Sequence, residues 1–528
     1  MRIALRLFVI FVLGMLASAG ARAGKLFIPM DATRQTNHLK AYGIAFAALR
    51  ENKPVYWLLN YKGGSFVMDD TRELEALCTQ RRVAFKKITT ADYDAIKKKI
   101  KGPNFNGEII KLEKAPKIAV YTPPNKEPWD DAVTLALTYA EIPFDKLYAD
   151  EVLAGGLDKY DWLHLHHEDF TGQYGKFWGQ FRHAPWYVND KNAAESMAAK
   201  HGFKKVSQMQ LAVVKKIRDF VAAGGNLFAM CSATDTYDIA LAAEGTDICD
   251  TPFDGDKMAP NAQSKLDYSK CFAFRDFTIS TNELEYEYSN IDNTNFRHVL
   301  KDSDKFILVS FPAKFDPGAA MLCQNHTDTI KGFMGQTTAF RKEVIKPGVL
   351  IMGDFAKVNE ARYIHGEYGD GTWTFYGGHD PEDYQHMVGA APTDLSLHPN
   401  SPGYRLILNN VLAPAAKKKL IQTVVLGDTV TAKLVKKIAE EPAHVSTFAE
   451  RVKITPDPSK EELIISVVPM QGAINEIKAV VILTGASVEV YSRKFSSADH
   501  VIVNLNDLPS GMFLVKVNGE YAGKVVKK

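Results

Sequence analysis

A cysteine and a histidine that lie far apart in the sequence could form a nucleophile–base pair. Cys231 directly follows the apolar segment 226–230, which is typical of a buried strand. His379 lies just after a second strand-like segment, and Asp380 and Glu382 follow it closely. An imidazole within reach of a thiol can accept its proton, and a carboxylate can orient the imidazole. We therefore predict Cys231 as nucleophile and His379 as base. Glu382 or Asp380 is the predicted orienting acid.

The segment around Cys231 favours a sharp turn between a strand and a helix. Ala229 and Ala233 are small residues two positions on either side, which a crowded turn of this kind requires. The start of a helix next to the thiol would favour the thiolate. The alternative interpretation is a buried structural cysteine, because free cysteines are often buried.

A second polar cluster, His166, His167, Glu168 and Asp169, follows the strand-like segment 160–165. Carboxyl ends of parallel strands meet at one edge of a sheet, so we expect this cluster near Cys231. Its residues could bind substrate, act as general acid or base, or hold a divalent metal ion. The alternative is a hydrogen-bonded loop that covers the sheet edge.

The order of the expected elements predicts an α/β protein. Strand-like and helix-like segments alternate over residues 24–116, which favours a parallel sheet in an N-terminal α/β unit. The same alternation continues over 117–415, where 208–223 is a strongly amphipathic helix. The acidic–apolar alternation of Glu283 to Tyr288 predicts a half-exposed strand.

The spacing of Cys231 and the later His379-x-Pro381-Glu382 motif resembles the class I glutamine amidotransferase-like superfamily. This resemblance covers 117–415 and implies a flavodoxin-like domain with a parallel sheet and a Cys–His–Glu triad. In this chain alanines flank the cysteine where the family has glycines, and Asp380 is inserted after the histidine. Together with 37–43 and 57–66, the region also resembles a Bacteroidetes group often labelled asparagine synthetase B.

Composition and charge exclude some classes of function. The chain has 64 basic and 62 acidic side chains, a net charge of +2, so no overall field attracts nucleic acid. Five cysteines leave at least one thiol unpaired in an oxidising compartment, and Cys249 with Cys271 is the expected pair. The cysteines form no C-x-x-C motif, which argues against a cysteine-based zinc site.

The N-terminus predicts export. A basic start and an apolar run from Leu7 to Leu16 precede Ala21-Arg22-Ala23, the pattern of a cleaved signal peptide over residues 1–23. A membrane anchor is the alternative, but the apolar run is short for a bilayer. No later stretch is apolar and long enough for an integral membrane span.

The C-terminal part changes character after a linker, 416–452. Over 453–528, short apolar-alternating segments separated by Pro, Gly, Asn and Asp predict a small all-β, immunoglobulin-like sandwich. Its motifs, ending in a basic strand at 524–528, resemble the C-terminal sorting domain of the type IX secretion system. The resemblance implies that the type IX machinery is a partner and that the protein passes through the periplasm to the outer surface or the medium. The alternative is an immunoglobulin-like binding module.

Three hypotheses of function follow. The first is a cysteine-dependent hydrolase of amide or ester-like bonds in a small molecule, peptide or glycan, without a cofactor. The second is a non-catalytic surface protein that binds carbohydrate or peptide in the same cleft. The third is a metal-dependent enzyme centred on His166, His167 and Glu168, which would need a divalent ion.

Overall fold

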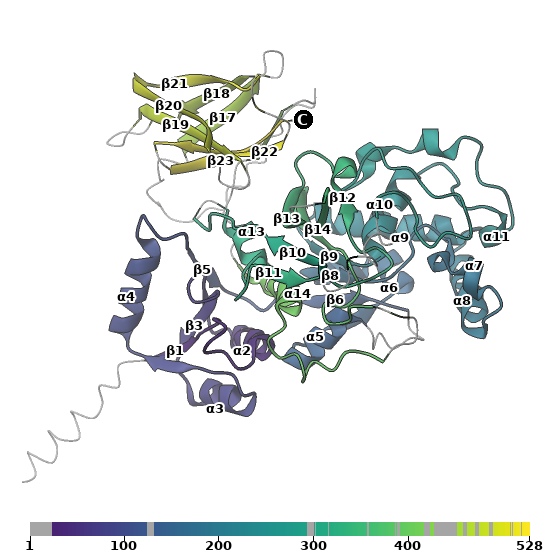
Figure 1. Cartoon of the computed structure of the whole chain (residues 1–528), viewed down its shortest axis with the longest axis horizontal. Coiled ribbons are helices and arrows are strands. Elements are labelled where there is room, and N and C mark those ends of the chain that lie inside the picture. Colours follow the sequence, from purple (N-terminus) through teal and green to yellow (C-terminus); the bar gives the residue numbers. More distant parts are fainter. Residues whose placement is uncertain are drawn as a thin grey trace, which may run out of the picture.

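The fold is taken from a computed structural model of the chain (Figure 1). It describes residues 24–123, 131–292, 300, 303–314, 316–355, 358–385, 387, 391–416 and 423–426, and from the C-terminal part 451–457, 462–469, 475–484, 489–506, 508, 511–518 and 520–527. The predicted signal peptide, residues 1–23, lies outside the described residues.

The N-terminal unit is built on a five-stranded sheet of order β4-β1-β3-β2-β5. Every pair in it is antiparallel, so the predicted parallel sheet was wrong for this unit. The reason is a tight turn between β2 and β3, where Asn60, Lys62, Gly63 and Gly64 all have positive φ and reverse the chain. The strands are β1 (Lys25–Ile28), β2 (Val55–Leu58), β3 (Ser65–Asp69), β4 (Lys86–Ile88) and β5 (Ile109–Leu112).

Helices pack on this sheet, and one of them also packs against the central domain. They are α2 (His38–Arg50), α3 (Arg72–Gln80) and α4 (Thr90–Lys101). The side chain of Asn37 caps α2 by accepting from the backbone of Lys40. Most of α2 is buried, because one continuous apolar core includes α2, strands of both sheets, and helices α5 (Ala132–Ala140) and α14 (Pro402–Leu412).

A buried arginine adds hydrogen bonds between the two units. Arg405, on α14, donates to the carbonyls of Met30 at 3.3 Å and Gly63 at 2.8 Å. Its guanidinium also lies 3.4 Å from the hydroxyl of Tyr42 on α2. The final helix of the central domain therefore satisfies backbone carbonyls just after β1 and in the connection between β2 and β3.

The central domain contains a ten-stranded sheet whose main path is β11-β10-β13-β14-β15-β9-β8-β6-β7. The half from β15 to β7 is parallel, as predicted. Its strands are β6 (Ile118–Tyr121), β7 (Asp145–Leu147), β8 (Trp162–Leu165), β9 (Asn226–Met230) and β15 (Gly371–Tyr376). Helices α6 (Ala149–Leu153), α8 (Pro185–Lys200), α9 (Val206–Ala222) and α10 (Ala233–Ala242) belong to this half.

The other half of the central sheet is antiparallel, so the sheet is mixed rather than parallel throughout. Its strands are β10 (Lys305–Leu308), β11 (Thr329–Lys331), β12 (Phe340–Arg341), β13 (Leu350–Phe355) and β14 (Glu360–Tyr368). β14 and β15 form a hairpin, because Gly369 turns the chain with positive φ. The short helices α7 (Trp178–Phe181), α11 (Thr251–Asp254) and α13 (Pro317–Leu322) lie in connections.

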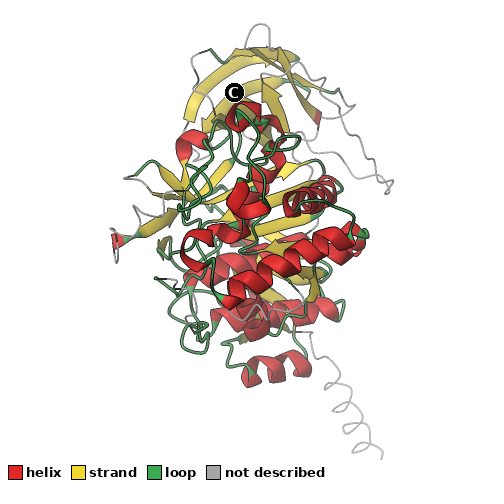
Figure 2. Ribbon diagram, turned by 90° about the vertical axis from the view of Figure 1, so that its right-hand side faces the viewer, coloured by secondary structure: helices red, strands yellow, loops and turns green. Residues whose placement is uncertain are grey.

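The C-terminal part is all β, as predicted, with its own apolar core. One sheet has the order β16-β23-β22-β19-β20 and the other β17-β18-β21. Figures 1 and 2 show these strands gathered at one end of the molecule. The strands are β16 (Thr423–Leu426), β17 (Val452–Asp457), β18 (Glu462–Val467), β19 (Ile477–Thr484), β20 (Glu489–Ala498), β21 (His500–Asn504), β22 (Gly511–Val517) and β23 (Glu520–Lys527). β16 lies within the predicted linker and pairs with β23.

Two local predictions were wrong. Glu283 to Tyr288 forms turns and bends rather than a strand, because none of the strands that the structure describes pairs with it. Cys249 and Cys271 are both free: their sulfurs contact the carbonyls of Thr171 and Asp238. Among the described residues, none of the helices has the length and apolarity needed to cross a bilayer.

Candidate functional site

Three neighbouring strands of the parallel half end at the candidate site. In the sheet, β9 lies between β8 and β15, so Cys231 at the end of β9 is flanked by His166 and His379. The backbone N–H of Cys231 donates to Gly378 O, and that of Ala233 donates to His166 O, both at 3.1 Å. The turn after β9 therefore holds both histidine-bearing strand ends in place. The predicted proximity of these segments is confirmed.

Cys231 has a strained backbone. Its φ is +51°, a conformation that residues other than glycine seldom adopt, and α10 begins two residues later. This is the sharp strand-to-helix turn on which several hydrolase families hold a nucleophile.

The sulfur of Cys231 faces the loop 335–338. Its Sγ accepts from the backbone N–H of Gln336 at 3.3 Å. Burial raises the pKa of the Cys231 thiol to about 11, although backbone N–H groups of Thr337, Gln336 and Ser232 act in the opposite direction. A buried thiol with this pKa is protonated at neutral pH and is not a ready nucleophile.

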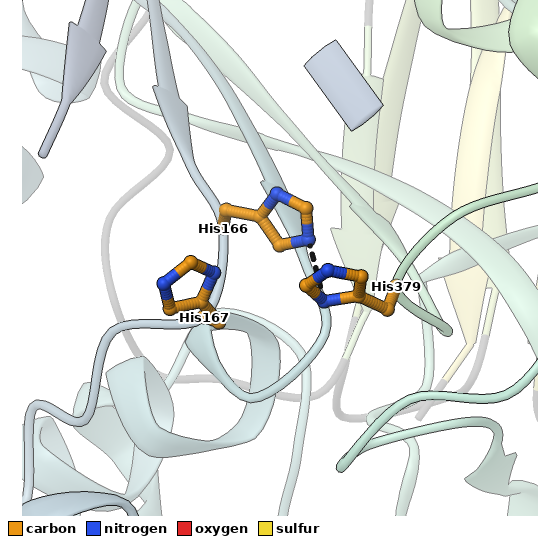
Figure 3. A group of neighbouring side chains, drawn as sticks. All are labelled: His166, His167 and His379. Carbon is orange, nitrogen blue, oxygen red and sulfur yellow. Dashed lines mark hydrogen bonds between the residues drawn. The ribbon is translucent and has the colours of Figure 1, made fainter. Parts of the chain in front are cut away.

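The ring of His379 takes part in a buried chain of polar groups. His379 Nδ1 lies 3.0 Å from His166 Nε2 (Figure 3). On the other side of the same ring, His166 Nδ1 lies 3.2 Å from Asp131 Oδ1. All three residues are almost fully buried. Because the Asp131 carboxylate is an acceptor, it favours the proton on His166 Nδ1 and leaves the lone pair of Nε2 directed at His379.

Asp131 is the fixed end of this series of buried polar groups. Its Oδ1 caps α5 by accepting from the N–H groups of Val133 and Thr134, and its Oδ2 lies 3.1 Å from His164 Nε2. Burial alone would raise its pKa, but the His164 and His166 imidazoles outweigh burial and hold the pKa of Asp131 well below its usual range. The carboxylate is therefore charged, and its position is set by a helix start.

His167 completes a group of three imidazoles. One ring nitrogen from each of His166, His167 and His379 lies within 4.8 Å of the others, an arrangement that could hold a metal ion. Figure 3 shows His167 beside the facing rings of His166 and His379. His167 is exposed, whereas the other two rings are buried, so this group opens toward solvent on the His167 side.

Two further groups among the described residues have the side-chain composition of a metal-binding site. In Asp131–His164–His166, the carboxylate is already engaged by α5 and both rings. In the group Asp247–Cys249–Asp254, the Lys205 ammonium lies 2.5 Å from the Asp247 carboxylate and 2.9 Å from that of Asp254. It therefore supplies the positive charge that a metal ion would otherwise provide.

The structure gives the two candidate orienting acids other partners. Asp380 Oδ2 accepts from the hydroxyl of Tyr404 at 2.7 Å, and Glu382 Oε2 lies 3.2 Å from His398 Nδ1. Asp380 also accepts from the backbone of Glu382 and so shapes the turn after His379. The ring of His379 is instead connected to Asp131 through His166.

Glu168 and Asp169 organise the loop after β8. Glu168 Oε2 accepts from the backbone of His166 at 2.8 Å, and burial raises the pKa of Glu168 to about 7. Asp169 accepts from the N–H groups of Thr171 and Gly175, and burial raises its pKa as well. Both carboxylates therefore fix the backbone that presents His166 and His167.

Sequence reasoning missed Asp131 and the loop 335–338. Asp131 precedes an apolar helix, so its sequence signal is that of an ordinary helix cap. Gly335 lets the loop approach the strand end: a Cβ there would lie 2.7 Å from the backbone nitrogen of His379. Sequence spacing gives no indication of such an approach between segments that are distant along the chain.

Several buried polar atoms around Cys231 have no hydrogen-bond partner among the described residues. They are Ser232 Oγ, Asp235 Oδ2 and Tyr288 Oη. Burial raises the pKa of Tyr288 well above its usual range, and the nearby acids, Tyr286 and Cys231 add to the rise. Buried polar atoms are normally satisfied, so these three are suited to the polar groups of a ligand.

A separate cavity of about 530 Å³ lies elsewhere, at Asn60, Phe311, Gln324 and His326. None of the predicted site residues lines it. Its amides are bonded to the protein, since Gln324 Nε2 donates to Asn60 Oδ1 and Asn325 Nδ2 donates to Pro402 O. The convergence of imidazoles and carboxylates at the sheet edge therefore identifies a better candidate site than this cavity.

Comparison with known proteins gives only remote likenesses. No family model matches the chain, and no curated protein matches it. The cytoplasmic protein STM3548 from Salmonella typhimurium is similar over 57% of this chain and 100% of its own, at 9% identity and a TM-score of 0.29.

Two glycoside hydrolases are also similar. The exo-β-1,4-mannosidase Op5Man5 from Opitutaceae bacterium strain TAV5 matches 50% of this chain and 31% of its own, at 14% identity and a TM-score of 0.22. A β-galactosidase from Bacillus circulans sp. alkalophilus matches 75% of this chain and 40% of its own, at 8% identity and a TM-score of 0.21.

Proposed function

We propose that this chain is an exported hydrolase that cleaves an amide or ester-like bond at the carboxyl edge of the parallel strands. The observation that carries the proposal is the buried series Asp131–His166–His379, in which His379 follows Gly378, the residue whose carbonyl accepts from the backbone of Cys231. A carboxylate that supports an imidazole is the arrangement by which hydrolases activate a nucleophile.

In this proposal the imidazoles activate the nucleophile. His379 accepts a proton from a water molecule as the water oxygen attacks the carbonyl carbon, and the charged Asp131 stabilises the resulting imidazolium through His166. The proton then passes to the leaving nitrogen or oxygen as its bond to carbon breaks. The unpartnered atoms of Ser232, Asp235 and Tyr288 would bind polar groups of the substrate.

The thiol of Cys231 is the second candidate nucleophile. Its positive φ on a strand-to-helix turn favours this role, and Gly378 connects it to His379. The likeness to the class I glutamine amidotransferase-like superfamily and its flavodoxin-like domain is part of this proposal. It is supported by the cysteine after β9 and the histidine after β15 on adjacent parallel strands. The orienting acid would then be Asp131, acting through His166, rather than Glu382 or Asp380.

Export by the type IX secretion system is the third element of the proposal. The all-β tail, whose last strand β23 contains Lys524 and ends in Lys527, supports the likeness to a sorting domain. The immunoglobulin-like character of this sandwich, the secretion machinery as partner, and delivery through the periplasm to the outer surface or medium belong to the same proposal.

The hydrolase proposal is tested with p-nitrophenyl esters, amino-acid p-nitroanilides and glutamine as substrates. We expect His379→Gln to lower kcat about 10²–10⁴-fold, the usual contribution of a general base. The matched control, His183→Gln, changes an exposed histidine outside the site and leaves activity unchanged.

A Cys231→Ala variant identifies the nucleophile. Complete loss of activity in that variant assigns the attack to the thiol, whereas retained activity assigns it to water. Equal activity in His379→Gln and His183→Gln would contradict the proposal as a whole.

A further inference from the structure

We infer that His166, His167 and His379 form a binding site for a divalent metal ion, with zinc as the preferred occupant and Asp131 as the supporting carboxylate. The three ligand atoms come from two strand ends that the turn after β9 ties together. The site therefore exists only in the folded sheet, and the spacing of residues in the sequence does not reveal it.

The spacing of the nitrogens fits tetrahedral coordination. Two imidazole nitrogens bound to zinc at about 2.0–2.1 Å lie about 3.4 Å apart. His166 Nε2 and His379 Nδ1 are already 3.0 Å apart, and one nitrogen from each of the three rings lies within 4.8 Å of the others. The exposed His167 ring would supply the third ligand. An ion would take the place of the proton that the facing nitrogens of His166 and His379 share.

The surroundings match those of a metal-binding histidine. In such sites, the ring nitrogen opposite the metal donates to a carboxylate, which fixes the orientation of the ring. Asp131 plays this part for His166, and α5 holds Asp131 in turn. Glu168, bonded to the backbone of His166, adds a second nearby carboxylate that would balance the charge of the ion.

Neutral imidazoles suit zinc, and three protein ligands leave a fourth position for water or substrate. The exposed side of His167 gives that position access to solvent. Metal binding itself does not depend on the hydrolase proposal, but the role of the ion rests on it. A bound ion would lower the pKa of its water to about 7, in place of proton transfer to His379. One proton of this water would pass to solvent, and the remaining hydroxide oxygen would bond to the carbonyl carbon. The bond from that carbon to the leaving nitrogen or oxygen would then break, and the hydroxide proton would go to the leaving atom.

The test measures bound metal directly on the full chain. Purified protein is treated with a chelator, equilibrated with excess zinc or cobalt, freed of unbound metal and analysed for metal content. We expect about one equivalent of zinc, and with cobalt the intense visible absorption of a tetrahedral site. His167→Ala should lose this binding, and His183→Ala should keep it.

Asp131→Asn tests the supporting carboxylate and should weaken zinc binding about 10–100-fold. Because this residue also caps α5, His167→Ala, which changes an exposed side chain, remains the decisive variant. Wild-type protein that retains no zinc, or equal zinc content in His167→Ala and His183→Ala, would overturn the site. Zinc binding without hydrolysis would support the metal site and contradict the hydrolase proposal. Full hydrolysis by metal-free protein would contradict only the catalytic role of the ion.

Discussion

The thiol of Cys231 occupies a strained backbone position, but its surroundings do not favour the thiolate. Burial raises the pKa of this thiol to about 11, so about 0.1% is ionised at pH 8. We predict that iodoacetamide modifies Cys231 slowly in the native protein, with a rate that rises about tenfold per pH unit up to pH 11. Mass spectrometry of the peptide that contains Cys231 gives the rate, and urea-unfolded protein is the control. Rapid modification at pH 7 would instead support the thiol as nucleophile.

The carboxyl group of Glu168 should make stability depend on pH. Its pKa is about 7 in the folded protein and about 4.3 when unfolded, so the folded state binds this proton more tightly. The stabilisation is complete below about pH 4 and is lost as the pH rises to about 7. Glu168→Gln should remove this slope and gain about 1–2 kcal/mol relative to wild type between pH 5 and 8, allowing for partial exposure.

Urea unfolding of metal-free protein at several pH values checks the Glu168 prediction. Glu51→Gln is the matched control, because Glu51 is an exposed carboxylate. A difference between Glu168→Gln and wild type that does not change with pH would contradict the assigned pKa.

At the scale of single residues, the sequence indicates the reactive types but not their pairings. His166, His167, Cys231 and His379 can be found because each follows an apolar strand, and parallel strands end at a shared edge. Asp131 cannot be found this way, because a helix cap and a histidine partner have the same sequence signal. The partners of a side chain depend on directions and distances that only the folded sheet sets.

At the scale of elements, the loop 335–338 controls the position of His379. The Cβ of an alanine at position 335 would lie 2.7 Å from His379 N and 2.9 Å from the carbonyl carbon of Gly378. We predict that Gly335→Ala costs about 1–3 kcal/mol of stability and lowers both activity and zinc affinity, because the backbone of His379 must move.

Urea unfolding and zinc titration measure the two effects of Gly335→Ala. Gly318→Ala is the control, since its added Cβ would meet only Asp316 Oδ1, at an ordinary 3.6 Å. If both variants bind zinc alike, the loop does not position the histidine.

Strand direction was the element-scale property that the sequence predicted least well. Alternation of strands and helices favours parallel pairing, yet the six-residue connection 59–64 reverses the chain between β2 and β3. This reversal depends on positive φ at four residues, among them Asn60 and Lys62. The parallel strands β6 to β9 were predicted because long helical connections separate most of them. Glu283 to Tyr288 alternates like a strand, but a strand also needs a partner, which alternation cannot specify.

At the scale of the whole molecule, the C-terminal sandwich is an independent core. Among the described residues, its apolar cluster contains residues from 452 to 525 and none from the central domain. We predict that deletion of residues 417–528 leaves the thermal unfolding midpoint of the remaining chain within a few degrees of the wild-type value, and abolishes secretion by a bacterium that has the type IX machinery. Calorimetry and immunodetection in the medium measure the two results. Undiminished secretion of the shortened chain would refute the sorting role.

The contact between Arg405 and the carbonyls of Met30 and Gly63 has a consequence for the time course of synthesis. The arginine leaves the ribosome 375 residues after Met30, so the first unit of the chain lacks its closing partner during most of translation. We therefore expect the N-terminal unit to reach its final packing only after α14 has been synthesised.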